Sequence, residues 1–591
     1  MKRAWLKLDC AIVAVITALA FAAASRYGLA YCDDILYISS QPMVMGGLGA
    51  DAVKFAFTDV SQAIWMPLAY LSYMLDVSVG WGYGGMHVQN ILWHAAGAVL
   101  LYLLLVRPFE SRAAAILGAL VWSVHPLRVE SVVWLAGRKD VISTFFLFAA
   151  VYSWVCAGRR DYGRIALALV LVSIGAMAKP SVMVFPAFAL AIDYGITGVR
   201  KEKEAYWLAI GLAVVVAVEA QVFQTAGHAT GYSALIPLWY RVLNALASLT
   251  VYVGNFVWPD KLALQCMIRY PDMPRFSVTG AVVLLAALLW VVKAAVPRCM
   301  SYMRTRDAEA LFAGGRAENT ALAGLAIFFA SLVPFLGVSG FGYHAFADRF
   351  TILPAAGLSV VIASVLSSCA WRKAALVATA VALSALFLRT LDQTRIWSDN
   401  VRLMENTLEV DRDNNIDTHR ALAVHYWQTD HDMEKVYHHM KKCWDYAWSD
   451  EVRDGIGISV CLFVEACFDT GHREEGEKMY QWLKEWSWRR WNARTAEFLM
   501  AQAVFDLNQD TPLAVKYAED TLKEIKSLEP DSYIAHEIAY RIALKKNDPV
   551  AIRAALEECA GEPSDTGCSC TVWASRLLRE MDGRTDTSTD E

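Results

Sequence analysis

Charged side chains are scarce over most of this sequence. Only 19% of the 591 residues are charged, whereas 56% are hydrophobic, and long apolar runs fill residues 1–390. A soluble protein of this length would not be so apolar, so the composition predicts a polytopic membrane protein. Because the acidic and basic residues crowd beyond Leu391, we expect a transmembrane domain over 1–390, a polar domain over 391–580 and a disordered tail over 581–591.

Two kinds of motif are also missing. No glycine-rich phosphate loop follows a predicted strand, and no Cys/His spacing fits a zinc site. An enzyme that uses a nucleotide sugar or zinc is therefore unsupported, and no nucleic-acid partner is expected. A divalent cation is the one cofactor that stays open.

Eleven apolar runs predict membrane spans when flanking residues help the shorter ones to cross. The basic residues of the short loops then all fall on one side, which the positive-inside rule makes cytoplasmic. This count places the loops 28–85, 127–140, 224–276 and 339–349, and everything after Thr390, outside. The runs lie near 9–27, 86–106, 112–126, 141–157, 164–178, 181–197, 205–223, 277–297, 319–338, 350–368 and 373–389.

Two apolar segments admit alternatives. The segment 235–258 is apolar enough to span, yet counting it would invert every later loop, so we expect it to be interfacial or re-entrant. The first run could be a cleaved signal peptide, since small residues follow a basic start. A signal anchor is preferred, because it would hold Asp33 on a helix.

The polar domain has the pattern of amphipathic helices joined by short turns. The turns recur about every 40 residues, somewhat more than the 34 of a tetratricopeptide repeat. A helical solenoid of this kind usually binds a peptide or protein, and the alternative is a cap over the membrane domain. Six cysteines could form disulfides in an oxidising compartment, with no pairing indicated: Cys443, Cys461, Cys467, Cys559, Cys568 and Cys570.

Two adjacent aspartates, Asp33 and Asp34, follow the first apolar run. A charge near the bilayer centre costs about 2.5–3.5 kcal/mol, so the pair must lie in water or in a protein cavity. Either residue could cap the helix expected from Ile35 onward. One aspartate would suffice for a cap. Adjacent carboxylates repel each other, which raises the pKa of one of them. The pair could therefore act as a general base or bind a cation instead.

Cations occur in the next outer loop, against the positive-inside pattern. The stretch SVHPLRVESVVWLAGRKDVIS, 123–143, carries Arg138 and Lys139 near Glu130 and Asp140. These residues could form a solvated ion-pair cluster. Alternatively, the cations could bind an anion such as a phosphate, for which arginine offers a bidentate fork.

Two more outer segments carry charge. The stretch HAFADRFTILP, 344–354, places Asp348 beside Arg349, and Lys179 lies at the outer end of the fifth span. A lone lysine at such a position usually snorkels to the interface. Together, acids and cations from four outer segments converge on one face, as a site for an anionic lipid headgroup requires.

Several of these stretches occur in the same order in a known family: DD at 33–34, WMPLAYLSYMLD at 65–76, HVQNILWHA at 87–95, HPLRVESVVWLAGRKDVIS at 125–143, AKPSVMVFP at 178–186 and ADRFTILP at 347–354. The chain resembles the bacterial relatives of the transmembrane and tetratricopeptide-repeat-containing O-mannosyltransferases, which are GT-C glycosyltransferases. The resemblance covers most of 28–360 and, loosely, the repeats. Met66 departs from it, since the family commonly has Arg or His before the Pro-Leu pair.

The resemblance implies an all-α fold, with a GT-C membrane bundle of about 11 helices followed by a helical-hairpin solenoid. It implies transfer of a sugar, mannose in this family, from a polyprenyl-phosphate donor to an acceptor hydroxyl. The chain would lie in the bacterial inner membrane. The repeats would lie in the periplasm and bind the acceptor protein or peptide.

Roles for the matching residues follow from the same resemblance. Asp33 would deprotonate the acceptor hydroxyl as an oxocarbenium-like state forms, while Asp34 orients it or helps to bind a divalent cation. Glu130 would be the second acid. The rest of the predicted site consists of the cations for the leaving phosphate and their neighbours: Arg138, Lys139, Arg349, Lys179, His125, Asp140 and Asp348. His125 could equally be a satisfied histidine at a helix end.

Other functions would use similar parts. A lipid-linked glycan polymerase or ligase, and a transporter of lipid-linked sugars, also need cations around a lipid phosphate at the outer face. A transporter would favour charges at mid-bilayer depth, whereas these charges lie at span ends. A non-catalytic scaffold that only anchors the repeats would need one span rather than eleven.

Overall fold

The computed structural model divides into two compact units, Met1–Asp411 and Arg412–Glu591. The expected domain boundary at 390 falls within a helix of the first unit, Arg372–Ile396. The structure describes residues 2–30, 33–60, 64–109, 111–226, 236–264, 266–268, 278–287, 289, 293, 300, 316–338, 344–369, 371–411, 415–429, 431–447, 459–490, 495–509, 511–529, 533–560 and 570–586.

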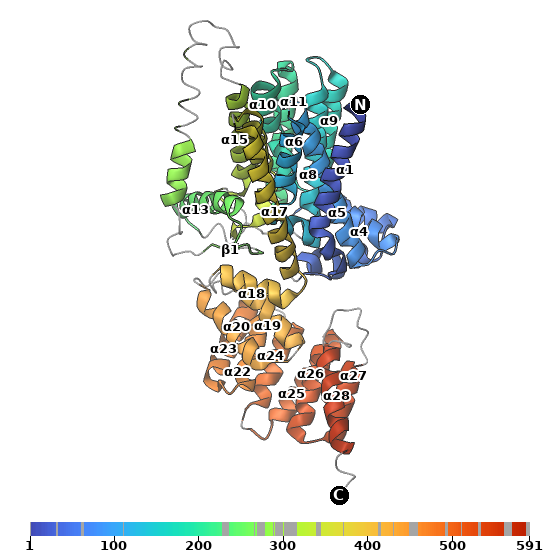
Figure 1. Cartoon of the computed structure of the whole chain (residues 1–591). Helices are drawn as coiled ribbons and strands as arrows, with labels where there is room; N and C mark the ends of the chain where they lie inside the picture. The colour runs from blue at the N-terminus through green and yellow to red at the C-terminus, as the bar shows by residue number, and fades with distance from the viewer. Residues whose placement is uncertain are drawn as a thin grey trace. The chain divides into compact units, whose positions relative to one another are not determined.

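Helices build nearly all of the described first unit (Figure 1). The α-helices are α1 (Lys2–Phe21), α2 (Pro42–Met45), α3 (Ala50–Thr58), α4 (Pro67–Ser78), α5 (Tyr83–Val106), α6 (Arg112–Ser123), α7 (Val129–Val133), α8 (Arg138–Cys156), α9 (Tyr162–Ala176), α10 (Phe185–Ile192), α11 (Lys203–Ala226), α13 (Leu238–Val257), α15 (Arg316–Leu332), α16 (Pro354–Ser368), α17 (Arg372–Ile396) and α18 (Asn400–Val410). The shorter helical turns are η1 (Ala22–Arg26), η2 (Ile35–Ser39), η3 (Pro126–Arg128), η4 (Leu135–Gly137), η5 (Pro180–Val184), η6 (Asp193–Thr197), η8 (Val333–Phe335) and η9 (Asp348–Thr351). One antiparallel ribbon pairs β1 (Cys266–Met267) with β2 (His344–Phe346). The expected all-α class is confirmed.

Many of these helices can cross a membrane. Among the described residues, seven helices are long and apolar enough, and the pair Arg112–Ser123 and Pro126–Val133, bent by 52°, would make an eighth. Three shorter apolar helices, Tyr162–Ala176, Val278–Ala287 and Pro354–Ser368, coincide with the remaining expected runs. The chain is therefore a multi-pass membrane protein.

Helix α13 is the segment expected to be interfacial or re-entrant, and it is not among the candidate spans. Figure 1 shows it lying across the direction of α15 and α17. Its polar side chains hold β2, because Ser248 Oγ and Asn244 Nδ2 donate to the Ala345 carbonyl at 2.8 and 3.3 Å. Since β2 leads into η9, α13 helps to position Asp348 and Arg349.

Helix α1 packs within the helical bundle of the first unit. It packs against α5, α6 and α17. Near its start, Arg112 donates two hydrogen bonds to the Asp9 carboxylate at 2.6 and 2.8 Å, and the Tyr102 hydroxyl donates a third at 2.6 Å. Near its other end, the hydroxyls of Thr17 and Ser123 lie 2.8 Å apart. The signal anchor stays a prediction, because these contacts describe the packing of α1 and not its processing.

The second unit is a chain of helical hairpins. Helix α19 packs on α20, α22 on α23, α24 on α25, and α26 on α27, with α28 against α27, and successive hairpins contact one another. The helices are α19 (Ile416–Gln428), α20 (Met433–Tyr446), α22 (Val460–Asp469), α23 (Arg473–Arg490), α24 (Ala496–Leu507), α25 (Ala514–Leu528), α26 (Tyr533–Lys546), α27 (Pro549–Ala560) and α28 (Cys570–Asp586). Cys443, Cys461 and Cys467 are free thiols, whereas Cys568 lies outside the described residues.

A buried ionic cluster joins two of these hairpins. On α26, Arg541 pairs with Glu465 and Asp469 of α22, and its Nε lies 2.7 Å from Glu537 Oε1 one turn away. Burial raises the pKa of Glu465 to about 8. One guanidinium thus compensates three carboxylates, so removing it would leave charge buried without a partner.

Candidate functional site

Acidic and basic side chains from separate segments meet at one end of the first unit. They come from the turn at η2, from α7, from the first turn of α8, from the residue before η5 and from η9. Ion pairs, hydrogen bonds and ring contacts link these segments. The charges therefore lie near the ends of apolar helices, as the sequence predicts.

Asp34 is fully buried and accepts hydrogen bonds from two stretches of backbone that lie far from each other in the sequence. The Ala30 N–H donates to Asp34 Oδ2 at 2.9 Å, and the Ala136 N–H donates to Oδ1 at 2.7 Å. The carboxylate makes no capping hydrogen bond to the η2 turn that follows it. Burial raises the pKa of Asp34 to about 7, although both hydrogen bonds favour the charged form. Asp34 is a structural tie rather than a helix cap.

Asp33 differs because its side chain is 32% exposed. Its Oδ2 lies 3.4 Å from Lys139 Nζ, and this ammonium also lies 4.4 Å from the centroid of the Tyr37 ring. Burial, together with the charge and hydrogen bond of Asp33, holds the pKa of Tyr37 well above its usual range. Tyr37 therefore stays a neutral donor, and Asp33 is the member of the pair that a substrate can reach.

Glu130 is held by Arg349 through both backbone and side chain. The Arg349 N–H donates to Glu130 Oε2 at 2.6 Å, and its guanidinium pairs with Oε1. The guanidinium carbon also lies over two rings, 5.3 Å from the centroid of Trp134 and 4.9 Å from that of Phe350. Glu130 thus fixes the direction of Arg349.

A second buried pair joins α8 to the chain before η5. Asp140 and Lys179 form an ion pair in which both side chains are nearly inaccessible. Lys179 Nζ also lies 5.5 Å from the centroid of the Phe335 ring and 5.7 Å from that of Phe350. Burial lowers the pKa of Lys179, whereas the Asp140 charge acts in the opposite direction. Lys179 is therefore packed within the protein rather than extended to the interface.

The guanidinium of Arg138 forms its hydrogen bonds with residues of α4 and α5. It pairs with Asp76, donates to Asn90 Oδ1 at 2.8 Å and to the Met86 carbonyl at 2.6 Å, and stacks over Tyr73 at 4.5 Å. The side chain is completely buried. Arg138 binds α8 to α4 and α5 and is not directed toward Asp33.

His125 and Asp348 both form hydrogen bonds to residues of α13. His125 Nδ1 accepts from the Leu127 N–H at 3.2 Å, so Nε2 is the donor to the Phe256 carbonyl at 3.0 Å, which satisfies the neutral ring. Asp348 Oδ1 accepts from Asn255 at 3.4 Å. Burial, with the nearby Glu130 charge, raises the pKa of Asp348 well above its usual range.

Sequence patterns missed an aromatic surface between the cations. Lys139 Nζ lies 5.8 Å and Arg349 Cζ 5.3 Å from the centroid of the same Trp134 ring. The Trp134 Nε1 is buried without a hydrogen-bond partner. In the sequence, Trp134 looks like one of many interfacial tryptophans, and only its place four residues before the Arg-Lys pair could have drawn attention to it.

Metal ligation by the aspartate pair would depend mainly on Asp33, because both Asp34 oxygens already accept backbone N–H groups. A second grouping lies in the hairpin unit, where ligand atoms of His431, Glu465 and Asp469 lie within 4.8 Å of one another. Arg541 already pairs with both of these acids. A metal ion there would have to displace the guanidinium.

Comparison with known proteins finds relatives of one kind. The chain is 28% identical over 97 residues to protein O-mannosyl-transferase TMTC3 of Homo sapiens, which covers 16% of this chain and 10% of that protein. It is 27% identical over 121 residues to protein O-mannosyl-transferase Tmtc1 of Drosophila melanogaster, and 28% over 143 residues to TMTC1 of Mus musculus. These alignments cover 20% and 22% of this chain, and 14% and 15% of those proteins. No protein-family model and no solved structure matches. The expected resemblance is confirmed over this limited part of the chain.

Proposed function

We propose that this chain, a relative of the protein O-mannosyl-transferases, is a membrane glycosyltransferase that moves a sugar from a polyprenyl-phosphate carrier to an acceptor hydroxyl. One observation carries the proposal. Accessible Asp33 lies 3.4 Å from Lys139, and Lys139 shares the Trp134 ring with Arg349. A base and two cations thus adjoin one small region near the ends of apolar helices, where a lipid phosphate would lie.

In the proposed step, Asp33 is the general base. The acceptor O–H bond breaks as its proton passes to the Asp33 carboxylate, and the oxygen forms the new bond to the anomeric carbon. The bond from that carbon to the phosphate oxygen breaks, and the lipid phosphate leaves with the electron pair. The transition state is oxocarbenium-like, and a positioned base contributes about 10²–10⁴-fold to the rate.

Lys139 and Arg349 would stabilise the leaving phosphate. Charge that develops on the phosphate is best met by cations whose positions are fixed beforehand in a site shielded from water. Glu130 and the Trp134 and Phe350 rings fix Arg349 in this way. Asp140 holds Lys179 nearby.

Asp34 and Arg138 would position the catalytic side chains rather than contact the substrate. Asp34 ties the turn before η2 to the backbone at Ala136, only three residues from Lys139. Arg138 fastens the start of α8 through Asp76. Because both groups have their hydrogen bonds satisfied within the protein, we assign them to holding Asp33 and Lys139 in register.

The second unit would bind the acceptor. Stacked helical hairpins commonly present an extended surface for a peptide or protein. We therefore propose a protein hydroxyl as acceptor, mannose as the sugar, and a periplasmic position for this unit. The relatives' names support the sugar and acceptor, and the basic short loops support the position.

The test uses the full chain purified in detergent, with polyprenyl-phosphate mannose as donor and threonine-containing peptides as acceptors. Asp33→Asn should lose transfer by about 10²–10⁴-fold with an unchanged melting temperature. The matched control is Asp51→Asn, an exposed aspartate on α3, which should keep parental activity. If Asp33→Asn transfers at a near-parental rate while Asp33→Ala melts early, Asp33 is structural and the assignment is wrong.

A deletion strain would identify the acceptor class. Mass spectrometry of its periplasmic proteins should show the loss of hexose-modified serine or threonine peptides. If glycans change and no peptide does, the enzyme is a lipid-linked glycan polymerase or ligase, which would use the same donor chemistry.

A further inference from the structure

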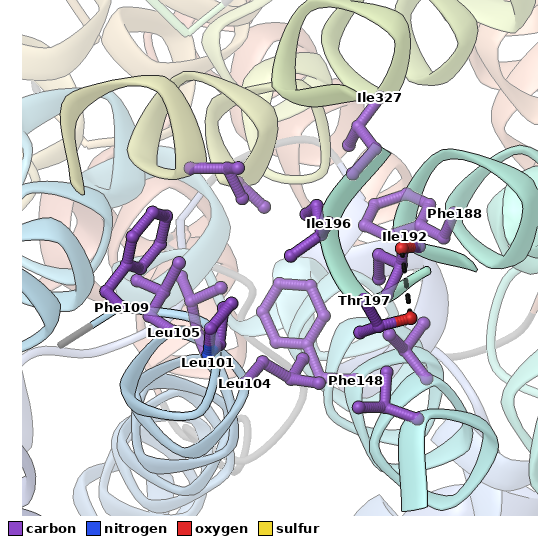
Figure 2. Close-up of a pocket in the computed structure, with 15 residues that line it drawn as sticks. Leu101, Leu104, Leu105, Phe109, Phe148, Phe188, Ile192, Ile196, Thr197 and Ile327 are labelled. Atoms are coloured by element: carbon purple, nitrogen blue, oxygen red, sulfur yellow. Dashed lines mark hydrogen bonds between the residues drawn. The ribbon is translucent and has the colours of Figure 1, made fainter. Parts of the chain in front are cut away.

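An apolar cavity lies in the first unit away from the charged site (Figure 2). Its lining is apolar except for Thr197 and comes from α5, α8, α10, η6, α15 and α16 and the residues just after α5. On α5, Asn90 contacts Arg138 whereas Leu105 lines the cavity, a separation of about 22 Å along the helix. We call this cavity the interhelical slot.

The interhelical slot is open at one end. Among its lining residues, Leu104, Val155 and Thr197, near the ends of their segments, are half-buried, whereas Leu101 and Phe148 are buried. On α8 and along α10 and η6, the buried lining residues are those closer to the charged site. The slot therefore opens at the opposite end of the bundle and closes toward the middle.

The slot has room for part of a hydrocarbon chain. Its volume is about 40 Å³, roughly three times what one water molecule needs. Figure 2 shows Leu101, Leu105 and Phe109 facing Ile192 and Ile196 across the space, with Phe148 between the two groups. An apolar space of this kind offers a polar ligand no partner, whereas methylene groups gain about 0.8 kcal/mol each on burial.

Polar contacts behind the slot fix the position of η6 relative to α8. Asp193 begins η6 and accepts from Trp154 Nε1 at 2.9 Å and from the Tyr206 hydroxyl at 2.7 Å, and Lys201 Nζ lies 3.2 Å away. A side chain at Gly195 would meet Ala323 at 2.6 Å, so η6 already lies against α15. The lining residues of η6 therefore cannot move in to fill the space.

A cation stands at the open end. Arg107 is exposed and directly precedes the lining residue Pro108. Its Nη2 donates to the Tyr152 hydroxyl at 3.3 Å, and its guanidinium lies 4.9 Å from the centroid of that ring. Tyr152 follows the lining residue Val151 on α8. A basic group near the membrane surface attracts an anionic lipid by about 1 kcal/mol.

We propose that the interhelical slot binds one acyl chain of an anionic phospholipid from the surrounding bilayer, with the phosphate beside Arg107. The chain enters from the open end and replaces the missing side-chain contacts between α5, α8, η6 and α16. This lipid is distinct from the polyprenyl carrier, whose phosphate would lie at the opposite end of the bundle. The bound chain would stabilise the bundle without taking part in sugar transfer.

The experiment uses the full chain in nanodiscs that contain phosphatidylglycerol with a diazirine at the end of one acyl chain. After irradiation, peptide mass spectrometry should find the label on slot residues such as Leu101 and Phe148. Val360→Phe, which fills the slot, should abolish this labelling. Val365→Phe, at a 54% exposed position of the same helix, is the matched control and should leave it unchanged.

A variant of Arg107 tests whether its charge attracts the lipid headgroup. Arg107→Gln should lower the preference for phosphatidylglycerol over phosphatidylcholine by about fivefold, the ratio that corresponds to 1 kcal/mol.

If Val360→Phe does not fold, as judged by helicity and melting temperature, Ala356→Leu fills the same space. Slot labelling that persists in a folded slot-filling variant would refute the proposal. So would labelling that excess polyprenyl phosphate removes more effectively than unlabelled phosphatidylglycerol, since the slot would then hold the carrier chain.

Discussion

At the scale of single residues, Asp33 and Asp34 are neighbours in sequence, but their carboxylates occupy different environments. Asp34 is buried between backbone N–H groups, whereas Asp33 is partly exposed beside Lys139. From the sequence, two adjacent acids at a membrane surface indicate a structural or functional role. The sequence does not predict which acid is accessible, because one partner of Asp34, the Ala136 N–H, is 102 residues away.

The raised pKa of Asp34 makes a prediction about stability and pH. Its folded-state pKa is about 7, above the ordinary value of 3.8, so the folded protein holds the proton more tightly than the unfolded chain. The stability from this proton is fully present below pH 3.8 and is lost as the pH rises toward about 7. The melting temperature of the parent relative to Asp34→Asn should therefore fall across this window. A constant difference would show that Asp34 does not titrate there.

Arg138 and Arg349 should respond differently to substitution. Arg138→Ala leaves Asp76 buried without its partner, and breaking such a pair costs about 3–5 kcal/mol, so the melting temperature should fall. Arg349→Lys keeps the charge but loses the planar fork that serves Glu130, so transfer should weaken with smaller effects on stability. Thermal unfolding and donor kinetics distinguish the two. The same pattern for both variants would contradict the division of roles.

At the scale of elements, the first turn of α8 distributes three adjacent charges to three partners. Arg138 pairs with Asp76, Lys139 with Asp33, and Asp140 with Lys179. Successive helical residues point about 100° apart, so a run of charged residues at a helix start cannot face one ligand together. The sequence predicts that Arg138 and Lys139 bind one phosphate together, whereas the helix directs their side chains to different partners.

The cluster around Arg541 makes a prediction for the helical hairpins. Arg541→Met should destabilise the second unit by about 3–5 kcal/mol, because Glu465 would stay buried without its partner. Arg553→Met is the matched control, since it removes an exposed arginine that pairs with Asp582, and it should change little. Tryptophan fluorescence during denaturant unfolding measures both variants. Equal unfolding midpoints would show that the cluster does not hold α22 to α26.

At the scale of the whole molecule, much of the fold follows from the apolar pattern, because each run that must cross a membrane needs a helix. The segments that form the charged cluster were also predictable, since cations on the predicted outer side break the positive-inside pattern. The ion-pair partners were not, because Glu130 and Arg349 are 219 residues apart and meet only through packing. The shared Trp134 ring was missed for the same reason.

The predicted orientation can be tested with cysteines at exposed positions. Val550→Cys in the second unit and Trp371→Cys at the start of α17 are both 80% exposed. If the second unit is outside, an impermeant maleimide should label the former in intact cells and the latter only after lysis. Cys443, Cys461, Cys467 and Cys559 are buried and would contribute little background, and Cys568 and Cys570 would be replaced by serine in both variants. Labelling in the reverse order would invert the orientation.

The contact between Asp9 and Arg112 has a consequence for biosynthesis. Helix α1 leaves the ribosome before α6, because the arginine that pairs with its carboxylate follows 103 residues later, which is roughly 5–20 s of synthesis. Throughout that interval the nascent α1 carries an unpaired acid at its start. The helix can reach its final place only once α5 and α6 have been made, so the order of translation separates entry of α1 into the membrane from its assembly.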